Sequence, residues 1–309
     1  MIKNSIYIIV SWVILFSFIF TELKAQQPYF DVKLWENGLP NSNGNDSGGY
    51  DLQEKSYKPI IRVFLPHKQK ATGRAIVCYP GGGYAQTQPE HYANDWAPFY
   101  TEQGIAFIVL HYRVPRGNPE VPIADALEAY NQTKLHAGEW RINPSDIGIQ
   151  GLSAGGHLAT TVTTHFQDSV KAAFQILIYP VITFKGPDTH SGSRNNLIGH
   201  PPVLNENASI SDTKIFKKKN IAYSNLKEYY SNEKHVSKTT PRAFIAVSDD
   251  DRLAINSILY YTALHRNQVP AVLHTYPSGG HGWHINVQNN KFIYSHLVEQ
   301  ELTAWLASF

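Results

Sequence analysis

The sequence predicts an α/β domain built on a mostly parallel sheet with helices on both faces. Three observations lead to this prediction. Apolar runs typical of strands alternate with segments of helical spacing, and most of these runs are continuously apolar. The third is a G-x-S-x-G pattern, which stands between one such run and the helical segment that follows it.

The regular alternation begins near residue 59. Continuous apolar runs, unlike alternating ones, indicate strands that are buried on both faces of a parallel sheet. The expected strands cover residues 59–65, 74–79, 105–112, 146–150, 174–182, 243–248 and 271–276. The expected helices cover residues 90–103, 122–140, 154–165, 254–267 and 290–307.

The N-terminus predicts export. Lys3 precedes an apolar run at residues 6–20, and Ala25 provides a small residue for cleavage, so we expect a signal peptide at residues 1–25. An uncleaved membrane anchor is the alternative, but the run is shorter than the roughly 20 apolar residues of a spanning helix. No stable membrane span is therefore expected after cleavage. The mature chain, residues 26–309, is expected to be one domain.

Composition narrows the compartment and the partners. Cys78 is the only cysteine, so no intramolecular disulfide can form, and an exported chain of this kind suits the bacterial periplasm or exterior. The formal net charge of +2 gives no reason to expect a nucleic-acid partner.

Two segments interrupt the regular pattern. Residues 28–58 are rich in Asn, Gly and Asp and are expected to form an extended lead-in with short strands, such as DVKLW. Residues 184–241 are polar and lie between two core strands. We expect this insertion to contain short helices and to cover part of the mouth of the active site.

The G-x-S-x-G pattern, Gly151 to Gly155, is the candidate nucleophile site. In α/β-hydrolases this spacing puts a serine, here Ser153, on a strained strand-to-helix turn that lifts its hydroxyl above the sheet. Side chains two residues away on either side would collide, which requires glycine there. A purely structural glycine turn is the alternative. His157 lies one turn into the helix. It is expected to be a packing residue or to contact the catalytic residues without contacting the substrate.

A glycine-rich loop, residues 79–84 (YPGGGY), directly follows an expected strand. Acyl transfer passes through an oxyanion that needs preorganised N–H donors. We expect these donors to be the backbone N–H groups of Gly82 and Gly83, with that of Ala154, the residue after the nucleophile. A phosphate-binding loop is disfavoured because neither G-K-[ST] nor G-x-G-x-x-G follows. A plain turn remains an alternative.

The acid and the base are expected after the last two strands. In this fold the triad runs Ser, Asp or Glu, then His along the chain. Residues 249–251 are three aspartates, of which Asp251 is the preferred acid and Asp250 the alternative, and His281 lies in a later glycine-rich loop as general base. The acidic run could instead be a solvated turn or a metal clip. A metal site with His281 and His284 has unspecific spacing, so we expect no metal and no cofactor.

Several segments together resemble a known family. The chain is similar to bacterial carbohydrate esterases of the α/β-hydrolase fold, especially acetyl xylan esterase-like proteins of Bacteroidetes, which are related to hormone-sensitive lipase. The matching segments follow the family's order over nearly the whole mature chain. They are residues 32–41 (VKLWENGLPN), 79–84 (YPGGGY), 109–115 (VLHYRVP), 124–129 (ADALEA), 142–159 (INPSDIGIQGLSAGGHLA), 191–199 (SGSRNNLIG), 247–253 (VSDDDRL) and 276–283 (YPSGGHGW).

This resemblance implies a triad of Ser153, an aspartate of 249–251 and His281, and removal of acetyl groups from xylan or related oligosaccharides. The chain departs from the family in three ways. Pro80 replaces the histidine of lipase relatives, and the segment after Asp251 is shorter and lacks a Val-Pro pair, which leaves the choice of aspartate open. Tyr92 stands where relatives often have glycine, which puts the shape of the acyl pocket in doubt.

Two other functions are alternatives to a secreted serine esterase. A peptidase of the prolyl-oligopeptidase type shares the triad order, but such enzymes usually carry a large propeller domain and too little sequence precedes the first core strand here. A non-catalytic binding protein on the same scaffold predicts a missing triad residue, and all three types are present.

Overall fold

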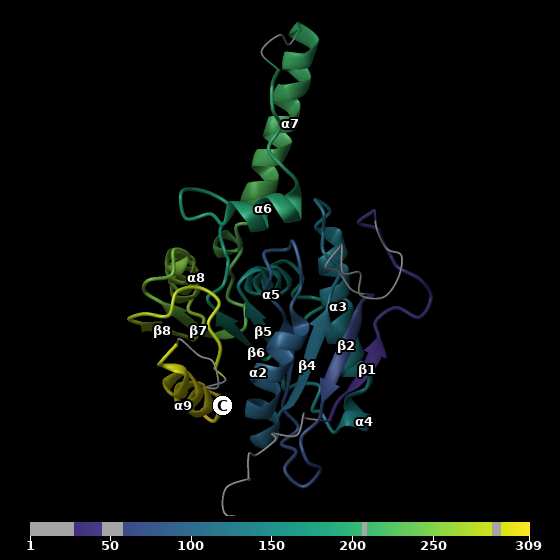
Figure 1. The fold of residues 1–309 in the computed structure, drawn as a ribbon, viewed down its shortest axis with the longest axis vertical. Helices are drawn as coiled ribbons and strands as arrows, with labels where there is room; N and C mark the ends of the chain where they lie inside the picture. The colour runs from purple at the N-terminus through teal and green to yellow at the C-terminus, as the bar shows by residue number, and fades with distance from the viewer. Residues whose placement is uncertain (1–27, 45–57, 206–208, 286–291) are drawn as a thin grey trace, which may run out of the picture.

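The computed structural model describes residues 28–44, 58–205, 209–285 and 292–309. Its centre is an eight-stranded sheet in the order β1-β2-β4-β3-β5-β6-β7-β8 (Figure 1). β1 and β2 are antiparallel to their neighbours, and β3 to β8 are parallel. The strands are Phe30–Lys33 (β1), Ile60–Phe64 (β2), Ala75–Tyr79 (β3), Ala106–His111 (β4), Ile147–Leu152 (β5), Phe174–Ile178 (β6), Arg242–Ser248 (β7) and Ala271–Tyr276 (β8).

Helices cover both faces of this sheet, and the strands feed two separate cores. Along β3, Ala75 and Val77 pack into one core, and Ile76 and Cys78 into the other, because successive side chains of a strand point to opposite faces. The first core is covered by Glu120–Leu135 (α3), Ala154–His165 (α5) and Ala254–Arg266 (α8); the second is covered by Pro89–Glu102 (α2) and Ser295–Leu306 (α9). The predicted fold class is therefore confirmed.

Some boundaries differ from the sequence prediction. The helix expected at 122–140 is divided at His136 into α3 and the short α4, Ala137–Trp140. The strand expected at 174–182 ends at Ile178, because Tyr179 has a φ of 37°, which no strand residue adopts.

The insertion, residues 184–241, holds one short helix and one long one. Ser191–Ile198 (α6) matches the expectation of short helices, but α7, Ile210–Tyr229, has 20 residues and projects away from the sheet (Figure 1). A capping box between Ser209 and Asp212 begins α7, and no glycine or proline follows within it. The expectation of short helices alone was therefore wrong. A 3₁₀ turn, Asn232–Lys234 (η1), leads back to the sheet.

The lead-in is tied to the domain by a buried ion pair. Arg113 Nη2 lies 2.8 Å from Asp125 Oδ1, and both side chains are almost completely buried. Trp35 Nε1 donates to the same carboxylate at 2.8 Å, and Arg113 Nη1 donates to the carbonyl of Asn41 at 2.8 Å. These bonds fix residues 35–41 against α3.

The predicted signal peptide and the domain boundary at residue 26 lie outside the described residues and stay predictions. No helix in the described ranges combines the length and the apolar character needed to cross a membrane.

Candidate active site

Ser153 occupies the turn between β5 and α5. Its φ of 53° and ψ of −120° are strained for a residue with a side chain. A Cβ on Gly151 would lie 2.4 Å from the carbonyl oxygen of Gly155, and a Cβ on Gly155 would lie 1.9 Å from that of Tyr79. Both positions therefore exclude every residue but glycine, which is the steric reason for the G-x-S-x-G pattern.

Three side chains from separate loops meet at this turn. Ser153 Oγ lies 2.7 Å from His281 Nε2, and His281 Nδ1 lies 2.7 Å from Asp251 Oδ2. The Asp251 side chain is fully buried, and the His281 side chain is 31% exposed. Asp251 also accepts a hydrogen bond from the backbone N–H of Leu253 at 2.8 Å, which fixes the carboxylate. This order, hydroxyl to imidazole to buried carboxylate, is that of an activated serine nucleophile.

The three consecutive aspartates lie in different surroundings. Asp250 does not contact the imidazole of His281. It accepts hydrogen bonds from the backbone N–H groups of Gly279 at 3.3 Å and Gly280 at 2.8 Å. The Asp249 side chain is exposed, and its backbone N–H donates to Tyr276. The structure thus brings the preferred acid, Asp251, to His281 and leaves the alternative acid on the backbone of the loop.

The glycine loop after β3 lies beside the serine. A Cβ on Gly81 would lie 3.2 Å from Ser153 Cβ. Gly82 has a φ of 132°, and a Cβ there would lie 2.1 Å from the carbonyl oxygen of Gln86, so no side chain fits. Within the described residues the N–H groups of Gly82 and Gly83 have no hydrogen-bond acceptor. Ala154 is the first residue of α5, where backbone N–H groups lack an intrahelical partner.

One residue of this site was not predicted from the sequence. Asn196, on α6 of the insertion, donates from Nδ2 to the carbonyl oxygen of Gly83 at 2.9 Å. The backbone carbonyl of Asn196 in turn accepts from Gly117 at 2.7 Å. The bond fixes the peptide plane that follows Gly83. Asn196 lies within the 191–199 segment that carried the family resemblance, but its partner is 113 residues away and no local pattern reveals it.

His157 is a buried connector between α5 and the insertion. Its Nε2 donates to the carbonyl oxygen of Tyr230 at 2.8 Å, its Nδ1 accepts from the Tyr84 hydroxyl at 3.0 Å, and its ring stacks on Phe184. Burial lowers the pKa of the imidazole to about 4, so the ring is neutral at pH 7. It has no contact with Ser153 through its ring nitrogens, as expected for a packing residue.

His284 contacts α2. Its Nδ1 lies 3.2 Å from Asp95 Oδ2, and its Nε2 lies 2.6 Å from the Nε2 of His91. Both ring nitrogens of His281 are already used by Ser153 and Asp251. The geometry therefore does not join His281 and His284 around one ion.

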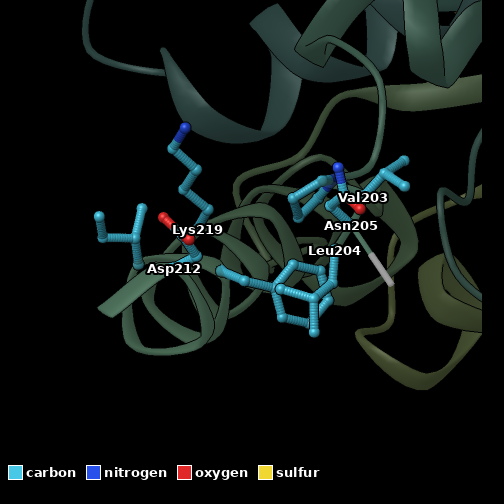
Figure 2. A pocket seen from close by; sticks show the side chains of 8 residues that line it. Val203, Leu204, Asn205, Asp212 and Lys219 are labelled. Carbon is cyan, nitrogen blue, oxygen red and sulfur yellow. The ribbon is translucent and has the colours of Figure 1, made fainter. Parts of the chain in front are cut away.

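A separate groove lies on the insertion. It runs between α7 and the segment 202–205 (Figure 2). It contains none of the residues of the triad or the glycine loop. The lining side chains are Pro202, Val203, Leu204, Asn205, Asp212, Ile215, Phe216 and Lys219.

Comparison with known proteins agrees with this architecture. A family model described as alpha/beta hydrolase fold matches residues 76–285, which include Ser153, Asp251 and His281. A solved structure, that of an acetyl ester-xyloside bifunctional hydrolase from Caldicellulosiruptor lactoaceticus, superposes with a TM-score of 0.68 at 26% identity, and the match covers 89% of this chain and 96% of that one.

Two relatives are similar over most of this chain. An acetylxylan esterase of Xylanibacter ruminicola is 34% identical over 255 residues, which is 81% of this chain and 48% of that protein. Endo-1,4-beta-xylanase B of Butyrivibrio fibrisolvens is 28% identical over 257 residues, 77% of this chain and 37% of that protein. The chain thus spans less than half the length of either relative. The resemblance found in the sequence is confirmed.

Proposed function

Because this chain belongs to the alpha/beta hydrolase fold family, we propose that it is a serine esterase that removes acetyl groups from xylan or related oligosaccharides. The single observation that carries the proposal is the 2.7 Å contact between Ser153 Oγ and His281 Nε2. The similarity to an acetylxylan esterase supports the substrate class.

The first half-reaction forms an acyl-enzyme. His281 Nε2 accepts the proton of the Ser153 hydroxyl as the oxygen attacks the ester carbonyl carbon. Asp251 holds the proton on Nδ1 and stabilises the imidazolium. The backbone N–H groups of Gly82, Gly83 and Ala154 donate to the oxyanion. His281 then gives its proton to the leaving sugar oxygen, and the C–O bond of the ester breaks.

The second half-reaction restores the serine. Water gives a proton to His281 Nε2 and attacks the acetyl carbon on Ser153. The oxyanion accepts from the same backbone N–H groups. The bond between the acetyl carbon and Ser153 Oγ then breaks, His281 returns the proton to Oγ, and acetic acid leaves and loses its proton to solvent. The ester, one water molecule and the side chains of Ser153 and His281 account for every atom and proton in the two half-reactions.

Tyr92 supports a small acyl group. Its hydroxyl lies 2.6 Å from the position that a Cβ on Gly81 would take, and Ser153 Cβ lies 3.2 Å from that same position. Tyr92 is buried. The Tyr92 hydroxyl and Ser153 thus border the same point beside Gly81, which supports limited room on this side and a small acyl group such as acetyl.

We propose further that the protein acts outside the cytoplasm, in the periplasm or secreted, after cleavage near Ala25. The apolar run at residues 6–20 supports this location.

The test is release of acetate by the purified mature chain from acetylated xylan, acetylated oligosaccharides and 4-nitrophenyl esters. Aminoacyl-anilides serve as the peptidase control. Labelling by a fluorophosphonate probe that is lost in Ser153→Ala would support the serine mechanism. Cleavage of anilides without release of acetate would contradict the esterase proposal, and no labelling of the native chain would favour a non-catalytic protein.

A further inference from the structure

His190 is a residue of the insertion that the mechanism above does not use. It is the N-cap of α6, and its Nδ1 accepts a hydrogen bond from the backbone N–H of Ser193 at 3.2 Å. The Ser193 Oγ lies 2.6 Å from the same nitrogen. The cap fixes the rotation of the ring, because the imidazole has to keep Nδ1 toward the first turn of α6.

The cap also fixes the tautomer. A nitrogen that accepts from an N–H carries no proton, so the proton of the neutral ring is on Nε2. The pKa of His190 is lowered by burial and by electrostatic interactions with Arg252 and His281, against an opposite effect of Asp251. The ring is therefore neutral at pH 7. In the described part of the chain its Nε2–H has no acceptor.

His190 lies at the glycine loop. Its Cε1 is 3.8 Å from the position that a Cβ on Gly83 would take, and the Ser193 Oγ is 4.0 Å from that position. The lack of a side chain on Gly83 thus leaves space that His190 borders. Asn196, six residues further along, holds the Gly83 carbonyl. The N-cap of α6 therefore lies near Gly83, the residue that is proposed to bind the oxyanion, and Asn196 of the same helix bonds to it.

The two ends of the glycine loop have different neighbours. Tyr92 lies next to Gly81, and His190 lies next to Gly83. The leaving oxygen has to depart toward His281, which protonates it. His190 therefore borders the end of the glycine loop away from Tyr92, and Tyr92 is the residue proposed to limit the acyl side.

We propose that His190 is a specificity-determining residue that binds the sugar part of the substrate, donating its Nε2–H to a sugar hydroxyl oxygen. The ligand class is a polyhydroxylated alcohol that carries an acetyl ester. This inference rests on the proposed esterase function and extends it to the alcohol side of the site. A site that donates to a sugar hydroxyl favours esters whose alcohol carries one, because esters that lack it lose this hydrogen bond.

The experiment compares two acetates, an acetylated xylo-oligosaccharide and 4-nitrophenyl acetate. Both give the same acetyl group on Ser153, so any difference between them arises before or during acylation and appears in kcat/KM. His190→Asn keeps a good N-cap and removes the ring, and His190→Gln returns an amide donor on a longer side chain. Ser153→Ala is measured with both substrates.

For His190→Asn we expect kcat/KM on the acetylated oligosaccharide to fall by about 10- to 100-fold, with a change of less than about threefold on 4-nitrophenyl acetate. His190→Gln should regain part of the loss. Equal losses on both acetates, or no loss on either, would overturn the inference. If the native chain cleaves only the aryl ester, the sugar assignment fails while the esterase stands. If Ser153→Ala retains activity on both, the proposed function itself fails.

Discussion

The carboxylate of Asp250 accepts a hydrogen bond from the backbone N–H of Gly280 at 2.8 Å, directly before His281 in the chain. The next carboxylate, that of Asp251, lies 2.7 Å from the ring of His281. Two consecutive acids thus hold the same loop in different ways. One fixes its backbone, and the other fixes the orientation of its imidazole.

This relationship predicts unequal effects of two identical changes. Asp251→Asn should lower kcat by about 10⁴-fold, because an amide at this position favours the wrong tautomer of His281. Asp250→Asn keeps a carbonyl oxygen as acceptor for Gly280 and should cost less than about tenfold. The measurement is kcat on 4-nitrophenyl acetate, with thermal unfolding as the control for folding. Similar losses in both variants would contradict the division of roles.

Removal of the nucleophile should separate chemistry from folding. Ser153→Ala should lower kcat by about 10⁴-fold or more, and His281→Ala by nearly as much, because the two act as a unit. Ser153→Ala removes a single hydroxyl group and should leave the fold intact, so its circular dichroism spectrum should match that of the native protein. Substantial ester hydrolysis in either variant would show that the triad assignment is wrong.

Asn196 should act on turnover more than on binding. Asn196→Asp has the same shape but has no N–H to donate to the Gly83 carbonyl, and it adds a negative charge facing that oxygen. We expect kcat to fall by about 10- to 100-fold with KM changed less than about threefold, because the bond holds the carbonyl side of Gly83, whose own N–H is a proposed oxyanion donor.

The matched control for this change is Asn195→Asp. It adds the same charge at the neighbouring position, where the Asn195 oxygen already accepts from Arg194. Activity close to native is expected there. If the two variants lose activity equally, a general effect of charge on α6 explains the loss and the positioning role of Asn196 does not hold.

The buried His157 should make the protein sensitive to acid. Its folded pKa of about 4 lies below the ordinary histidine value of about 6.5, so between these values the unfolded chain binds a proton that the folded chain does not. Stability from this group is complete above pH 6.5 and is lost as the pH falls toward 4. Over that range the loss is on the order of 3 kcal/mol.

The check is urea unfolding at pH 7 and pH 4.5 for the native chain and for His157→Gln. The variant should be less stable at pH 7, since it disturbs the contacts with Tyr84 and Tyr230. Its further loss at pH 4.5 should be smaller than that of the native chain. The same pH dependence in both proteins would mean that His157 is not the group that titrates.

Much of the fold could be predicted because β2 to β7 are buried on both faces and are therefore mostly apolar. The candidate nucleophile could be predicted because its turn excludes side chains at Gly151 and Gly155, which leaves a local pattern in the sequence. The end of β6 could not be predicted. Tyr179 adopts a positive φ through its tertiary surroundings, and its own residue type gives no sign of this.

Site residues that lie far from their partners in the sequence could not be predicted either. Asn196 is polar and sits in a polar insertion, so nothing local distinguishes it from Asn195. The roles of Asp250 and Asp251 depend on which carboxylate points inward after β7. Three identical residues in a row do not reveal this, and the shorter segment after Asp251 makes the family pattern a weaker guide to the triad acid.

The contact between α6 and Gly83 has a consequence for exchanging parts between related hydrolases. Replacing residues 184–241 by the corresponding segment of another enzyme would alter the sugar-facing surface and, at the same time, remove the amide that braces the loop after β3. A chimera with a new substrate range would therefore also turn over more slowly, unless the new segment supplies its own hydrogen-bond donor to the Gly83 carbonyl oxygen.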